Sequence, residues 1–156
     1  MMPTMNRLLA VMLLTMMFAA CETGVSWDRQ ERENASHIFK SLDYAHEAAR
    51  RANRLPHDWE PGGDDVAPVI NALDDAIIHA SQVRQSVLQK AHPNLNARFR
   101  VDYLRSLQGL RDYYETGDYD SDRHPGNTLG DFSEWFYQNQ HEFRWWRGYE
   151  RDLDLQ

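Results

Sequence analysis

Apolar residues recur along this chain at steps of three and four, in one stretch after another. Such spacing places the apolar side chains on one face of an α-helix, which can then be buried against other helices. No segment alternates apolar and polar residues in the way that a half-buried strand requires. The sequence therefore predicts an all-α protein.

Four segments carry an apolar stripe, and they cover roughly residues 28–55, 64–92, 94–116 and 128–149. Gly117 is expected to stop the third. The stripe residues are Ile38, Leu42, Ala45, Ala49 and Ala52; Val66, Ile70, Leu73, Ile77, Ala80 and Val87; Phe99, Tyr103, Leu107, Leu110 and Tyr114; and Leu129, Phe132, Phe136, Phe143 and Trp146. Four amphipathic helices with such seams are what an antiparallel four-helix bundle requires, so we expect that architecture.

Capping residues mark where three of these helices are expected to begin. Asp28 with Glu31, and Thr128 with Asp131, have the spacing of reciprocal helix caps. Asn94 can cap the third helix through its side-chain oxygen.

The first twenty residues have the composition of an export signal. Arg7 precedes the apolar run Leu8 to Ala20, which is too short to span a bilayer core of about 30 Å. The run ends in Phe18-Ala19-Ala20-Cys21, which resembles the lipobox of bacterial lipoproteins, where an aliphatic residue and two small residues precede an invariant cysteine. An ordinary secretory signal or a retained anchor helix is the alternative interpretation.

The lipobox resemblance implies cleavage before Cys21, a thioether-linked diacylglycerol on its sulfur and, usually, a third acyl chain on its amine. Several acyl chains give lasting membrane anchorage. Glu22 stands where aspartate is the usual inner-membrane retention signal, so the resemblance implies the outer membrane, on its periplasmic face. The expected organisation is a signal peptide (1–20), a lipidated cysteine with a tether (21–27) and one helical domain (28–156).

Composition limits the functions of this domain. Cys21 is the only cysteine, so no disulfide can form within one chain. Of 17 basic and 24 acidic residues, cleavage removes only Arg7, which leaves 16 basic residues and a formal charge of −8. A nucleic-acid partner is not expected, because there is no net basic charge to neutralise phosphates.

One acidic loop is a candidate metal site. Its alternating side chains are Asp118, Asp120, Asp122 and His124. They resemble the opening of an EF-hand calcium loop, but Arg123 stands where that pattern has glycine and Leu129 where it has glutamate. Calcium binding is one interpretation of this loop, and a solvated acidic loop is the other.

The histidines are a second candidate, because helical bundles hold metals through inward carboxylates and histidines. Asp43 lies three residues before His46, and Asp75 lies four before His79, so each pair shares a helix face. A periplasmic metal or small-ligand binder built on His46 and His79, or on the acidic loop, is therefore the alternative function.

No motif of an enzyme is present. The sequence contains no Gly-x-Ser-x-Gly elbow, no glycine-rich phosphate loop with its lysine, and no second cysteine for nucleophilic chemistry. We therefore expect no catalytic residues.

The last predicted helix carries eight aromatic residues between Phe132 and Tyr149, more than one seam can bury. Aromatic residues and arginine are enriched at binding hot spots. The predicted contact surface is Tyr137, Arg144, Trp145, Arg147 and Tyr149. The alternative is a wide apolar face beneath a loop.

These features together predict a lipid-anchored protein that binds another envelope protein in a secretion or accessory role. In size, anchor and helical content the chain looks like the pilotins that escort secretin subunits, an analogy that no motif supports.

Overall fold

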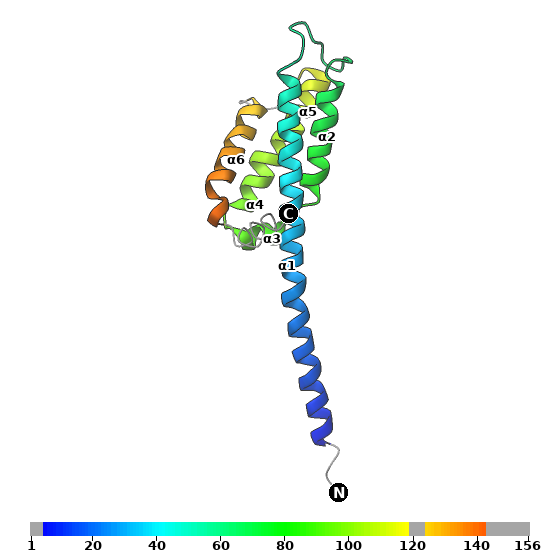
Figure 1. Cartoon of the computed structure of the whole chain (residues 1–156), viewed down its shortest axis with the longest axis vertical. Helices are drawn as coiled ribbons and strands as arrows, with labels where there is room; N and C mark the ends of the chain where they lie inside the picture. Colours follow the sequence, from blue (N-terminus) through cyan, green and yellow to red (C-terminus); the bar gives the residue numbers. More distant parts are fainter. Residues whose placement is uncertain (1–4, 119–123, 143–156) are drawn as a thin grey trace, which may run out of the picture.

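The computed structural model describes the backbone of residues 5–118 and 124–142 and the side chains of residues 29–118 and 124–142. All regular structure in these residues is helical, which confirms the all-α class. The elements are α1 (Met5–Ala52), α2 (Ala67–Ser81), α3 (Gln85–Ala91), α4 (Leu95–Arg98), the π-helix η1 (Phe99–Leu104), α5 (Arg105–Thr116), α6 (Pro125–Asn139) and the 3₁₀-helix η2 (Gln140–Glu142). Figure 1 shows the other helices gathered around the C-terminal half of α1. Within the described part, no helix combines the length and the apolar character needed to cross a membrane.

Helix α1 is longer than the first helix that the sequence predicts. It is helical from Met5 and includes residues 21–27, where a tether was expected before a cap at Asp28. Leucine, alanine and methionine dominate the first twenty residues and are strong helix formers, so nothing in that run interrupts a helix. Processing at Cys21 stays a prediction.

Among the described helices, α1 and α2 share the most extensive contact, and they run antiparallel. Arg51 Nη1 donates to Pro68 O at 2.9 Å near one end, and Ser41 Oγ donates to Ala76 O at 2.7 Å further along. Small side chains line the contact, which lets the two helices approach closely. The buried residues are Ala35, Ile38, Leu42, Ala45 and Ala48 on α1 and Val69, Ala72, Leu73, Ala76 and Ala80 on α2. Ala49, which the stripe included, is exposed, and Ala48 takes its place.

The predicted second helix over 64–92 is wrong, because the chain leaves the helical path between α2 and α3. Arg84 has extended backbone angles, φ −83° and ψ 122°. The buried Asn34 side chain of α1 donates to Arg84 O and accepts from Arg84 N, both at 3.0 Å. Arg84 O also accepts from Val87 N and Leu88 N in the first turn of α3, so it is the Arg84 N–H that depends on Asn34 for its partner, and the amide ties this turn to α1.

The predicted third helix exists as one helical run with a π-helical section in its middle. Arg105 N bonds to Arg100 O, five residues back, in place of the usual four. Four of the buried side chains of this run are spaced by four residues: Leu95, Phe99, Tyr103 and Leu107. An α-helix of 3.6 residues per turn would rotate such a series steadily away from the core. The wider π turn offsets that rotation, so all four side chains stay buried.

Only part of the predicted capping is observed. Gly117 ends α5 with a left-handed φ of 81°, as predicted. Asn94 stands at the start of α4, but its side chain makes no capping hydrogen bond. The predicted start of the last helix at Thr128 is wrong, because His124 Nδ1 accepts from Gly126 N at 3.1 Å and caps α6 earlier.

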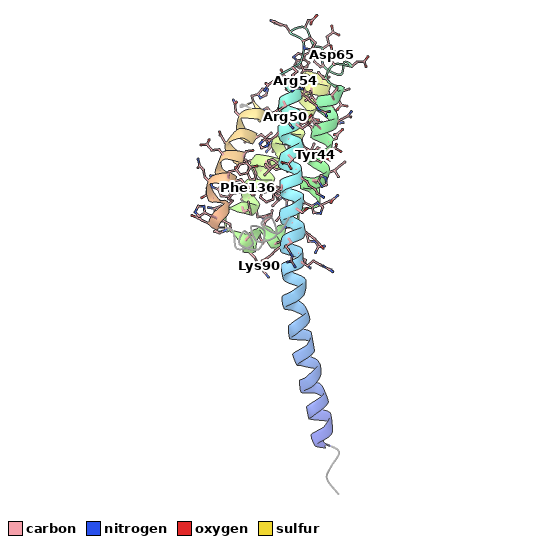
Figure 2. The ribbon with its side chains drawn as sticks, in the orientation of Figure 1. Tyr44, Arg50, Arg54, Asp65, Lys90 and Phe136 are labelled. Carbon is pink, nitrogen blue, oxygen red and sulfur yellow. The ribbon has the colours of Figure 1, made fainter. Side chains whose placement is uncertain are left out.

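Helix α6 closes the core with two phenylalanines, both fully buried as the sequence predicted. The Phe132 ring lies 4.7 Å from that of Tyr103 in η1. The Phe136 ring meets Phe39 of α1 edge-on at 5.8 Å. These contacts attach α6 to both α1 and η1, and Figure 2 shows Phe136 on the side of α6 that faces α1.

The hydrogen bonds between Asn34 and Arg84 predict that removing the Asn34 side chain lowers stability. Asn34→Ala leaves the Arg84 N–H without its acceptor and removes one of the hydrogen bonds to Arg84 O, so the free energy of unfolding should fall by about 1–3 kcal/mol. Urea denaturation followed by circular dichroism measures this. Asn71→Ala, at an exposed position of α2, is the matched control and should change stability by less than about 0.5 kcal/mol. Equal effects of the two substitutions would contradict the role given to Asn34.

Candidate functional site

Two histidines meet where α1 packs against α2. His37 Nδ1 and His79 Nδ1 are 3.3 Å apart, with the ring centroids 5.6 Å apart. The Tyr44 ring stacks on His79 at 5.6 Å with an interplanar angle of 9°. Because Tyr44 follows His37 by seven residues, both side chains project from the same face of α1. Tyr44 lies midway along the part of α1 that the other helices surround (Figure 2).

The surroundings of His37 favour its neutral imidazole. Partial burial lowers the pKa of His37, and the neighbouring His79 and Lys40 lower it further, while Glu33 acts in the opposite direction. In the neutral state one Nδ1 carries a proton and the other accepts it. The pair can therefore act as a hydrogen-bonded couple or, when both rings carry their proton on Nε2, as two lone-pair donors.

A buried chain of hydrogen bonds lies next to the histidines. Ser41 Oγ donates to Ala76 O at 2.7 Å, so its single proton is used. Tyr103 OH, 2.8 Å from Ser41 Oγ, must then be the donor between the two hydroxyls. Burial raises the pKa of Tyr103, and the hydrogen bond to Ser41 opposes this only in part. The phenol stays protonated and links η1 to α1 and α2.

The predicted pairing of His46 with His79 is wrong. His46 follows His37 by nine residues, which places it about 180° around α1 from the histidine pair. The His46 ring instead stacks on Tyr137 of α6, with centroids 6.5 Å apart and an interplanar angle of 17°. A site shared by His46 and His79 is therefore excluded, because His46 points away from the side of α1 that meets His79 of α2.

The acidic loop is only partly within the described residues. Asp118 is exposed, and its backbone N donates to Thr116 Oγ1 at 3.2 Å. His124 Nδ1 serves as the cap of α6. Asp120 and Asp122 lie outside the described residues. Elsewhere in the described chain, no three histidine, cysteine, aspartate or glutamate side chains converge on one point. Calcium binding by this loop stays a prediction.

The predicted contact surface is represented by one described residue. Tyr137 is 41% exposed and lies on α6 beside α1. The other four members, Arg144, Trp145, Arg147 and Tyr149, lie outside the described residues, as does the side chain of Cys21.

Trp135 of α6 is held by two neighbouring side chains. The Arg98 guanidinium lies 4.7 Å from the Trp135 ring centroid, and His92 meets that ring edge-on at 5.6 Å. A cation over an indole face is a favourable contact. With Phe132 and Phe136 buried, the described aromatic residues of α6 thus divide into three that pack inside the domain and one, Tyr137, that faces outward.

Sequence reasoning did not single out His37. It directly precedes the core residue Ile38, which places it at the edge of the buried face. Its spacing of seven from Tyr44 was the available signal, but the partner on α2 can be identified only once the two helices are aligned.

Comparison with known proteins gives no match, whether with family models, characterised proteins or solved structures.

The buried hydroxyls yield a second stability prediction. Ser41→Ala leaves the Tyr103 hydroxyl buried without its acceptor and should lower the free energy of unfolding by about 1–3 kcal/mol. Tyr103→Phe removes the donor while Ser41 keeps its bond to Ala76, so the loss should be smaller, about 1 kcal/mol. Tyr44→Phe, the same change at an exposed ring, is the control.

A double-mutant cycle on Ser41 and Tyr103 measures the coupling between them by chemical denaturation. A coupling indistinguishable from zero would contradict the hydrogen bond.

Proposed function

We propose that this chain is a lipid-anchored lipoprotein of the bacterial envelope whose helical domain, an antiparallel four-helix bundle, binds another envelope protein. The anchor is supported by the lipobox-like Phe18-Ala19-Ala20-Cys21 after a short apolar run. In the proposed bundle, the run from α4 through η1 to α5 is the third helix. The alternation of chain direction between α1 and α2 fits this arrangement.

The observation that carries the binding proposal is the placement of Tyr137. A tyrosine that is 41% exposed presents a large amphipathic ring to a partner. Its stacking on His46 holds that ring in one orientation before binding. A side chain ordered in advance loses less entropy on association, which favours affinity.

Charged and polar residues of α1 lie beside Tyr137. Asp43, His46 and Arg50 are exposed and spaced by three and four residues, so they form one row on the face beside α6. Arg50 Nη2 lies 2.5 Å from Glu47 Oε2, which fixes the position of the cation. An aromatic anchor with a mixed-charge rim is typical of a protein-binding face. Tyr137, Asp43, His46 and Arg50 are called the α1/α6 face below.

Crosslinking tests the α1/α6 face. A photoreactive residue at position 137 of the full chain should give a discrete crosslinked adduct in intact cells. The same residue at the exposed position 75 of α2 should not, because α2 lies away from that face. Tyr137→Ala should weaken capture of the adducted protein by on the order of tenfold, with helicity unchanged. Equal adducts from both positions would contradict the proposal.

Fractionation and mass spectrometry test the anchor separately. The mature protein should start at Cys21 and carry the added mass of the acyl chains, and it should fractionate with the outer membrane. Cys21→Ser removes the acylated thiol and should prevent both the cleavage and the added mass. An intact N-terminal Met1, or an unmodified Cys21, in the wild-type protein would overturn the lipoprotein assignment while leaving the α1/α6 face open to its own test.

A further inference from the structure

The Nδ1 atoms of His37 and His79 approach each other from two different helices. Their separation of 3.3 Å is short enough for one hydrogen bond. It is also the separation that two nitrogen ligands have around one tetrahedral ion. With metal–nitrogen bonds of about 2.0–2.1 Å, the tetrahedral angle gives a nitrogen–nitrogen distance of about 3.3–3.4 Å.

The two rings are held in place by their surroundings. Each histidine directly precedes a core residue in the sequence. His37 precedes Ile38 of α1 and His79 precedes Ala80 of α2, and both core residues are buried. Tyr44 lies parallel to the His79 ring and limits its rotation. Ser41 joins the same two helices through its bond to Ala76, one turn along from the pair. Binding of an ion would therefore need little rearrangement, and preorganised ligands give tighter sites.

We propose that His37 and His79 form a two-imidazole site for a Zn²⁺ ion, which bridges α1 and α2. Imidazole nitrogen is a preferred ligand of this ion. Within the described residues no third histidine, cysteine or carboxylate completes the site, so water fills the remaining positions.

The charges near the pair affect this site in opposite directions. Lys40 acts on His37 as a positive charge and Glu33 as a negative one, both from α1. On α2, Asp75 precedes His79 by one turn and lies on the same helix face. Burial and the cationic neighbours favour the unprotonated imidazole, which is the form that binds metal. The site is independent of the α1/α6 face, because His46 lies on the opposite side of α1.

Thermal unfolding of the full chain, prepared without a polyhistidine tag, tests the proposal with ZnCl₂ as the probe. An ion that bridges two helices binds only the folded protein, so Zn²⁺ should raise Tm. His37→Gln and His79→Gln keep a polar side chain of similar size and should each abolish the rise. His46→Gln, on the same helix but the opposite face, is the matched control and should retain it.

Calorimetric titration with Zn²⁺ gives the affinity directly and remains informative if a variant is less stable. Removing one of two protein ligands should weaken binding by on the order of tenfold or more. The His46→Gln control should keep the wild-type Zn²⁺ affinity. Unchanged Zn²⁺ affinity in both the His37 and His79 variants would overturn the proposal, as would a wild-type Tm that Zn²⁺ does not move.

Discussion

The Asn34 amide determines how the chain returns after its first two helices. It donates to and accepts from the backbone of Arg84, fifty residues away, and is itself almost completely buried. Without this pair of bonds the Arg84 N–H would lose its acceptor, which is costly, whereas Arg84 O would keep its bonds from Val87 N and Leu88 N of α3. The bonds make a break between α2 and α3 acceptable, and the break brings the following chain back across α1 toward η1 and α6.

The contact between α1 and α2 combines close packing with a small number of polar links. Alanine lines much of the seam, so the helices approach closely and their edge residues meet. Ser41 and its partners join the two helices to η1 inside the core, and His37 meets His79 at the margin. The same geometry thus serves both stability and the proposed metal site. The aromatic ring of Tyr137 belongs to the opposite side of α1, where α6 packs.

Much of the helical content and core could be predicted from spacing alone, since Ile38, Leu42, Phe132 and Phe136 are all buried as expected. The interruption before α3 could not, because the apolar stripe continues through it and its cause is a residue on another helix. The histidine pair could not be predicted either, because it also depends on how two helices pack. His79 was recognised, but its partner was assigned to His46, because the sequence does not give the relative rotation of α1 and α2. The start of α6 was also predicted wrongly, because both His124 and Thr128 can cap a helix and the structure uses His124.

The π-helical section between α4 and α5 determines which residues of α5 face the core. If Phe99–Leu104 formed ordinary α-helix with the same number of residues, every later residue would turn by about 100° around the axis. Leu107 and Leu110 would then leave the interior, and Arg111 would lose its alignment with Asp74 on α2. The helix would remain intact, yet its inner and outer sides would be exchanged in part. The wide turn thus takes up one residue more than an α-helix would hold in the same rotation.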